Sequence, residues 1–216
     1  MDVKEKIDQF CQKISRMASE ISANDFALGQ QLSETNMPIL ITVFRLALEL
    51  YATDSACLKV LENLFSSAEN CNIQTVFMTI SEEEIKVLSD FAETFIQVGK
   101  HAEAVKLFQF LTLLCPKGAP NPYAYVRLAE SLAQLNIDAG AQLYDFILNV
   151  FPDNPAILFS ASKCYYENER PKRALRVLTQ AKEICERHEN NDEFRKFLEL
   201  IAPELLKIQE EVAAKR

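Results

Sequence analysis

One pattern of large and small apolar residues recurs three times between Ile85 and Arg187 and dominates this chain. In each copy two small residues lie eleven or twelve positions apart, with larger apolar residues around them at helical spacing. Antiparallel helices approach closely only where small side chains face each other, so each copy predicts a helical hairpin. The small residues are Ala92 and Ala104 in the first copy, Ala129 and Gly140 in the second, and Ser162 and Ala174 in the third.

Prolines and the spacing of the copies identify the type of hairpin. Pro116 and Pro152 stand near the end of the second predicted helix, where a residue without an N–H cannot continue the helix. Together with the small residues, they form the signature of the tetratricopeptide repeat. Three copies in near register, which begin at Ile85, Pro122 and Pro155, predict an all-α tetratricopeptide-repeat superhelix of three helical hairpins.

Helix-capping residues fall at the starts of the predicted helices. Asn121 and Asn154 each precede a proline at the first helical position, which is the favoured order at a helix start. Ser81 stands three residues before Glu84, the spacing of a capping box, and opens the first copy. Residues 190–192 are predicted to cap a final helix after the repeats.

The chain before the repeats also reads as helical. Residues 1–22 have the apolar spacing of an amphipathic helix, and a polar connector follows over residues 24–36. Two more helices are predicted, over residues 38–51 and from about residue 55 to residue 67. Residues 70–80 are an isolated apolar stretch, which predicts a short helix or an ordered loop because a single strand would have no partner.

Three parts are therefore predicted. Residues 1–80 form an N-terminal helical region that serves in dimerisation or covers a groove, and residues 81–187 form the three repeats. Residues 188–216 form a C-terminal capping helix, which a superhelix needs in order to close its exposed end. Pro203 within that helix predicts a kink or a restart.

Composition and charge narrow the classes of function. The net charge of the 216-residue chain is −8, whereas nucleic-acid binding needs a basic stripe, so no nucleic-acid partner is expected. The most apolar stretch, Ile39 to Leu50, is too short to span a bilayer and contains Arg45 and Glu49, so no stable membrane insertion is expected. Six scattered cysteines and a charged amino terminus without an apolar signal core predict a cytoplasmic protein.

The sequence offers little catalytic chemistry. His101 and His188 are its only histidines, and the predicted helices place them far apart. Cys185 shares a helix face with His188, but a zinc site needs more than two protein ligands. Four scattered glycines cannot build a phosphate cradle. We therefore expect no catalytic residue, no metal and no cofactor, and we predict that the protein is not an enzyme.

A peptide-binding groove is the predicted functional site. The first helix of each hairpin lines the concave side of such a superhelix. Several side chains on that side are apolar or aromatic at positions that the repeat itself does not require, which indicates a surface that something apolar covers. The candidate groove residues are Ile96, Tyr123, Val126, Glu130, Phe159, Lys163 and Tyr166.

Two kinds of occupant fit this groove. One is an extended peptide whose alternate side chains enter pockets between the helices. The other is the chain itself, through residues 70–80 or the amino-terminal helix. A clamp for a chain-terminal carboxylate would need converging Lys, Arg and Asn side chains, and Lys86 with Lys163 makes a poor one. A heat-shock co-chaperone is therefore disfavoured.

About half of the chain, residues 85–187, resembles a known family. The phrase from Ser160 to Tyr165 is similar to the third-repeat Ala-x-Cys pattern of the translocator chaperones of bacterial type III secretion, the class II chaperones. The other residues that carry the resemblance are Phe91–Ala92 through Pro116, Leu128–Leu132, Pro155 through Phe159, Leu178 and Ala181–Glu183.

The resemblance implies a small acidic chaperone of the bacterial cytoplasm. Such proteins keep hydrophobic translocator subunits soluble before secretion by gripping an extended client segment in the concave groove. Many self-associate through an amino-terminal helix, so a homodimer formed in this way is one expectation here. The region before Ile85 is longer than in the family and matches none of it. The alternative function is a repeat scaffold or adaptor that joins protein partners.

Overall fold

The structure, a computed structural model of the 216-residue chain, describes residues 5, 7, 8, 11, 12, 37–67, 80–114, 119–188 and 191–214. Over these residues the regular structure is entirely α-helical, which confirms the predicted fold class. Contacts within the chain divide it into two compact units, Met1–Ala124 and Tyr125–Arg216. The predicted three-part organisation, with boundaries at residues 80 and 187, stays a prediction.

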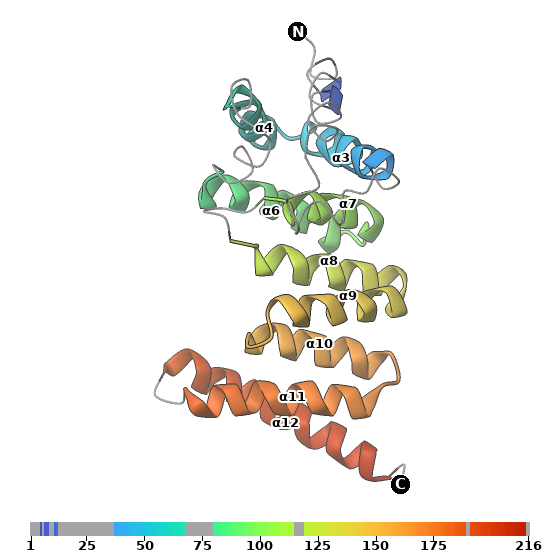
Figure 1. Cartoon of the computed structure of the whole chain (residues 1–216), viewed down its shortest axis with the longest axis vertical. Coiled ribbons are helices and arrows are strands. Elements are labelled where there is room, and N and C mark those ends of the chain that lie inside the picture. Colours follow the sequence, from blue (N-terminus) through green and yellow to red (C-terminus); the bar gives the residue numbers. More distant parts are fainter. Residues whose placement is uncertain are drawn as a thin grey trace, which may run out of the picture. The chain divides into compact units, whose positions relative to one another are not determined.

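The first unit contains the first predicted hairpin and the two helices before it. In the hairpin, α6 (Glu82–Gln97) packs on α7 (His101–Leu111). Of the preceding helices, α3 (Met37–Tyr51) packs on α7, and α4 (Ser55–Ser67) packs on α6 (Figure 1). Both preceding helices lie where the sequence predicts them, and together they contact both helices of the first repeat.

Aromatic side chains join α3 to this hairpin. Phe44 meets Phe110 of α7 edge to face, with ring centroids 5.6 Å apart. The buried phenol of Tyr51 donates a hydrogen bond of 3.3 Å to the carbonyl oxygen of Leu107. Its ring centroid also lies 5.7 Å from that of Phe91 on α6. These contacts anchor α3 on both helices of the first repeat.

The second unit contains the other two hairpins and the closing helix. The helix α8 (Pro122–Leu135) begins in the last residues of the first unit and continues into the second, followed by α9 (Ile137–Val150). Next, α10 (Pro155–Glu167) packs on both α9 and α11 (Pro171–Arg187). Finally, α12 (Asp192–Ala214) packs on α11 and lies obliquely across it (Figure 1). This sequential packing is that of tetratricopeptide repeats with a C-terminal capping helix.

Capping residues begin the helices as predicted. Ser81 accepts a hydrogen bond from the Glu84 N–H, and the Glu84 carboxylate accepts one from the Ser81 N–H, so the capping box forms. The Asn154 side chain accepts hydrogen bonds from the N–H groups of Ala156 and Ile157 at 3.1 and 3.2 Å. Such caps satisfy N–H groups that have no partner within the helix. Asn121, Asn136 and Asn191 cap α8, α9 and α12 in the same way.

Gly140 marks the close approach within the second hairpin. It is buried on α9, and a Cβ built on it would lie 2.5 Å from the Cβ of Ala133 on α8. No side chain fits at that distance, so the two helices reach this separation only with glycine at position 140. The contact falls on Ala133, one helical turn beyond Ala129, which the repeat pattern pairs with Gly140.

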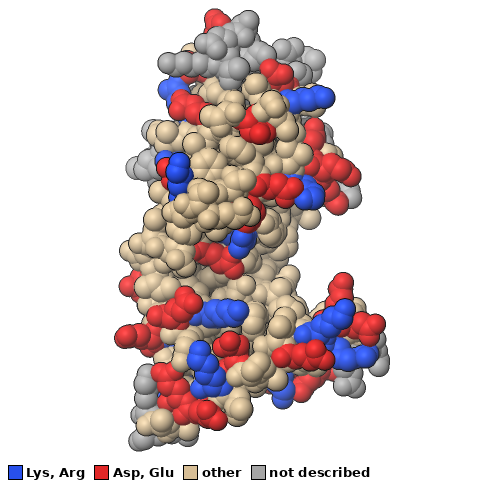
Figure 2. Space-filling view, turned by 180° about the vertical axis from the view of Figure 1, so that it is seen from behind, with Lys and Arg blue, Asp and Glu red and all other residues tan. Residues whose placement is uncertain are grey.

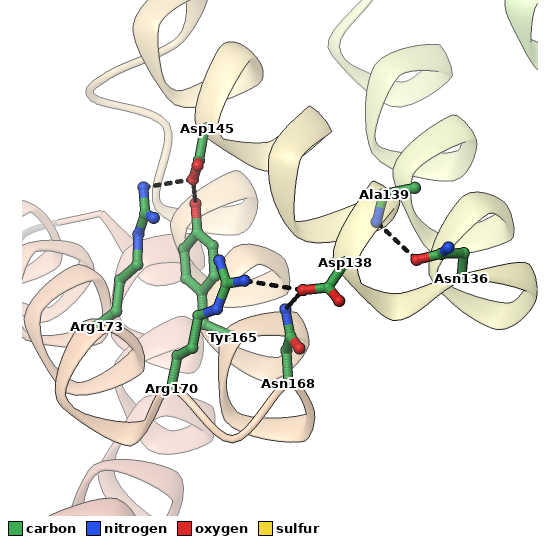
Figure 3. A network of polar contacts seen from close by, with 8 residues as sticks. All are labelled: Asn136, Asp138, Ala139, Asp145, Tyr165, Asn168, Arg170 and Arg173. Atoms are coloured by element: carbon green, nitrogen blue, oxygen red, sulfur yellow. Dashed lines mark hydrogen bonds and ion pairs between the residues drawn. The ribbon is translucent and has the colours of Figure 1, made fainter.

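Polar contacts tie α9 to the third hairpin (Figure 3). Asp145 on α9 accepts a hydrogen bond from the Tyr165 hydroxyl on α10 and pairs with the Arg173 guanidinium on α11. Near the start of α9, Asp138 pairs with Arg170 at 2.8 Å, in the turn between α10 and α11. Two carboxylates on one helix therefore hold the turn of the next hairpin and the helix ends beside it.

The closing helix is continuous through its proline. α12 runs from Asp192 to Ala214 with Pro203 inside it, so the predicted restart of the helix at this residue is wrong. The residues that it buries recur at three-to-four spacing and make one apolar stripe. They are Ile201, Leu205, Ile208 and Val212.

Several predicted segments lie outside the described residues. They include most of the amino-terminal helix predicted over residues 1–22, the connector over residues 24–36, and all but Ile80 of the stretch over residues 70–80. Of the amino-terminal segment, Ile7 and Cys11 are buried, and Asp8 pairs with Arg45 of α3.

Candidate functional site: the predicted groove residues

Two of the candidate groove residues belong to the first unit. Ile96 is half-buried near the end of α6, and Tyr123, at the start of α8, has 46% of its surface exposed. The Tyr123 hydroxyl donates a hydrogen bond to the Glu93 carboxylate, and its ring lies edge to face with Phe108 at a centroid distance of 6.4 Å. These contacts orient Tyr123 while leaving nearly half of it accessible to a ligand.

The second repeat contributes Val126 and Glu130, one turn apart on α8. Both are half-buried, and Val126 packs against the hydrophobic core of the second unit. The Glu130 carboxylate pairs with the Arg127 guanidinium at 2.6 Å. The negative charge is thus compensated locally, so this part of α8 presents an apolar side chain beside a paired carboxylate.

In the third repeat, Phe159 and Lys163 stack on one face of α10. The Lys163 Nζ lies 4.3 Å from the centroid of the Phe159 ring. The same ring meets Phe197 of α12 edge to face, with centroids 5.6 Å apart. Phe159 is half-buried and Lys163 is exposed. The ring is therefore held on one side by the closing helix, while the ammonium group faces solvent.

Tyr166 also contacts the closing helix. The Lys207 Nζ lies 4.7 Å from the centroid of its ring. Its phenol is hydrogen-bonded to Glu211, and this bond, together with desolvation and the nearby charges of Glu211 and Glu204, raises the pKa of Tyr166. A protonated phenol is thus the stable form opposite these carboxylates.

The closing helix therefore contacts two of the seven candidate groove residues, Phe159 and Tyr166. The sequence suggested residues 70–80 or the amino-terminal helix as segments of the chain that would cover the groove. Among the described residues it is α12 that supplies these contacts, through Phe197, Lys207 and Glu211. Phe197 is visible in the sequence as part of an apolar stripe, but the stripe does not indicate which helix it meets.

Acidic and basic side chains are interspersed on the face that Figure 2 shows, without a stripe of one sign. Among the helices that the structure describes, none combines the length and the apolar character needed to cross a bilayer. No group of three or more His, Cys, Asp or Glu side chains within the described ranges is placed to hold a metal ion.

The described cysteines are buried thiols. Burial, with the Asp54 carboxylate nearby, raises the pKa of Cys57 to about 12. Burial is also the main reason why the pKa of Cys164 is raised, to about 11. The pKa of Cys185 is raised for the same main reason. A thiol that stays protonated at neutral pH is a poor nucleophile, so these residues act as small apolar side chains.

Solved structures with the same arrangement of helices are proteins of type III secretion. The translocator chaperone SycD of Yersinia enterocolitica has a TM-score of 0.51 and 22% sequence identity, over 59% of this chain and 92% of SycD. The fold is that of the translocator chaperones. PcrH from Pseudomonas aeruginosa has a TM-score of 0.51 and 18% identity, over 60% of this chain and 95% of PcrH.

A third structure contains a bound segment of another protein. It is PcrH in complex with the chaperone binding region of PopD, with a TM-score of 0.50 and 17% identity, over 61% of this chain and 96% of that chain. No protein-family model and no curated protein sequence matches the chain. The resemblance seen in the sequence is thus confirmed at the level of the fold.

Proposed function

We propose that this protein is a secretion chaperone that binds an extended apolar segment of a translocator or effector client and keeps it soluble. The observation that carries the proposal is the shared fold with PcrH, which has been solved with the chaperone binding region of PopD. The client would lie along the first helices of the repeats, in contact with Ile96, Tyr123, Val126, Glu130, Phe159, Lys163 and Tyr166.

The chemistry of these residues supports an extended, mostly apolar segment. Tyr123 offers an oriented aromatic surface, and Val126 an aliphatic one, so alternate client side chains would find apolar contacts. Each square ångström of apolar surface removed from water contributes about 25 cal/mol, which favours covering an aggregation-prone client segment. The exposed Lys163 ammonium would bind client carbonyl or carboxylate oxygens and so help to set the register.

The closing helix would limit the site at the third repeat. Because α12 already contacts Phe159 and Tyr166, the client would reach only the remaining accessible part of these rings. Most of the new apolar contact would then fall on Ile96, Tyr123 and Val126, which belong to the first two repeats.

The test is a matched pair of variants and one binding measurement. Tyr123→Ala removes the most exposed apolar or aromatic side chain among the candidate groove residues, and Phe146→Ala removes an aromatic ring, 41% exposed, from the second helix of a hairpin. We expect Tyr123→Ala to weaken calorimetric binding of a translocator's chaperone-binding peptide at least tenfold, and Phe146→Ala to leave it unchanged. Equal effects of the two variants, or none from Tyr123→Ala, would favour the scaffold alternative.

A further inference from the structure

One side of α12 faces α10, and its contacts identify that side. The ring centroid of Phe197 lies 5.6 Å from that of Phe159. Two helical turns further along α10, the Tyr166 ring lies under the Lys207 Nζ at 4.7 Å, and its phenol is hydrogen-bonded to Glu211. Phe197, Lys207 and Glu211 therefore mark the side of α12 that is turned toward α10.

Leu200 belongs to this side of α12. An α-helix turns by about 100° per residue, so Leu200 lies only about 20° around the axis from Lys207 and about 20° from Glu211. Along the axis it comes three residues after Phe197 and seven before Lys207. Residues that contact α10 therefore stand on both sides of Leu200, around the helix and along it.

The Leu200 side chain is nevertheless accessible. It is 55% exposed, although its neighbours on this side of α12 contact Phe159 and Tyr166. A single exposed leucine is ordinary on a helix surface, so the position of Leu200 matters more than its exposure. Its accessible surface is contiguous with two candidate groove residues, and it extends their apolar surface onto α12.

Leu206 provides the contrast. It is 58% exposed on the same helix, but it lies about 180° around the axis from Phe197 and about 140° from Glu211. Leu206 therefore stands on the side of α12 that is turned away from α10. The two leucines match in residue type, helix and exposure, and they differ in whether they adjoin the candidate groove.

Leu200 also lies level with the middle of α10. The two helices run in the same direction, since Phe159 meets the earlier and Tyr166 the later of the contact positions on α12. Leu200 lies between those positions, so its counterpart on α10 is Lys163, which lies between Phe159 and Tyr166. Lys163 is exposed, and its Nζ lies 4.3 Å from the centroid of the Phe159 ring.

We propose that Leu200 is part of the client site and binds an aliphatic side chain of the client beside Phe159. The inference rests on the proposed function and adds α12 to the surface that the repeats provide. An aliphatic partner is expected because leucine offers no hydrogen bond, so a polar side chain would lose hydration there without compensation. Covering Leu200 and the free part of the Phe159 ring removes apolar surface from water.

Calorimetric binding of one translocator peptide to two variants tests this proposal. The peptide is the chaperone-binding region of a hydrophobic translocator encoded beside this gene. We expect Leu200→Ala to weaken binding about tenfold, because three carbon atoms leave the contact, and Leu206→Ala to leave it unchanged. Both positions are exposed, and thermal unfolding checks that both variants stay folded. Equal effects of the two variants, or none from Leu200→Ala, would overturn the proposal.

Tyr123→Ala distinguishes the failure of this inference from the failure of the proposed function. If the same peptide binds more weakly to Tyr123→Ala but equally well to Leu200→Ala, α12 is not part of the site and the chaperone function stands. If the peptide does not bind the unchanged protein at all, both proposals are overturned.

A photo-cross-link identifies the client residue that lies against α12. Leu200, and separately Leu206, is replaced by the photo-reactive amino acid benzoylphenylalanine, and the cross-linked peptide residue is found by mass spectrometry. We expect a cross-link from position 200 alone, to an aliphatic residue or its direct neighbour. Cross-links of equal yield from both positions would contradict the proposed contact.

A double-mutant cycle then tests whether that client residue and Leu200 touch. Its change to alanine in the peptide should weaken binding to the unchanged protein about tenfold. The same peptide change should have much less effect on binding to Leu200→Ala, because one contact is then lost only once. Losses that simply add would show that the two side chains do not meet.

Discussion

The ring of Phe159 on α10 meets the ring of Phe197 on α12 edge to face, with centroids 5.6 Å apart. One of these residues is a candidate client contact and the other belongs to the closing helix. Lys207 and Glu211 extend the same contact to Tyr166. The closing helix therefore stabilises the last repeat and also covers part of the surface that the sequence assigned to a client.

Removal of the Phe197 ring should loosen this junction. Phe197→Ala deletes a half-buried aromatic contact, and we expect it to lower the free energy of unfolding by about 2 kcal/mol in a urea titration. Leu135→Ala, at a side chain that is 56% exposed at the end of α8, is the control and should change it by less than about 0.5 kcal/mol. If both variants lower the free energy of unfolding by the same amount, the ring contact does not hold α12 in place.

Gly140 should tolerate no side chain. Glycine to alanine in a helix normally stabilises a protein, by up to about 1 kcal/mol, because alanine loses less backbone entropy on folding. Here the added Cβ would overlap Ala133, so we expect Gly140→Ala to destabilise the protein by about 1–3 kcal/mol.

Its matched control is Gln142→Ala, an exposed change on the same helix, which should be neutral or slightly stabilising. Thermal unfolding followed by circular dichroism measures both variants. A stabilised Gly140→Ala protein would show that α8 and α9 do not approach as closely as described.

Alkaline pH should destabilise the folded chain. Burial raises the pKa values of Tyr51, Tyr144 and Tyr165 above the ordinary value of 10.0, and the Asp145 carboxylate adds to the effect on Tyr165. The folded protein then holds these protons where the unfolded chain releases them. Their contribution to stability is complete below about pH 10 and is lost as the pH rises above it.

Urea titrations from pH 8 to pH 11 measure this dependence. The free energy of unfolding should begin to fall near pH 9, because the pKa values of the buried Cys57 and Cys164 thiols are also raised above their ordinary value of 9.0. Tyr165→Phe should be less stable at neutral pH by about 1 kcal/mol, through loss of the hydrogen bond to Asp145, and should decline less steeply above pH 10. A stability that stays constant up to pH 11 would contradict the assigned burial of these groups.

The sequence predicted the helices well because their signals are local. The capping box of Ser81 and Glu84, the cap at Asn154 and the small residue at Gly140 all depend on contacts within one hairpin. Such contacts occur at fixed sequence separations, so a pattern of residues can reveal them. The pairing of α3 with α7 and of α4 with α6 has no comparable pattern, because it depends on distant surfaces.

The candidate site was harder to predict for the same reason. Helical periodicity indicates which side chains of α10 turn away from the hairpin core, and it predicts Phe159 and Tyr166 as groove residues. Periodicity does not indicate what covers them, and the structure places Phe197 and Lys207 of α12 there. The contact of Tyr123 with Glu93 likewise joins residues thirty positions apart and follows from packing alone.

The most direct test of the proposed function is the mass in solution of the protein expressed with a candidate client. A hydrophobic translocator encoded beside this gene, or its chaperone-binding region, is the client to use. Multi-angle light scattering should show a discrete complex of one client with one or two copies of this chain, with the client soluble only in its presence. An unchanged mass with the client still insoluble, for every such translocator, would contradict the chaperone function.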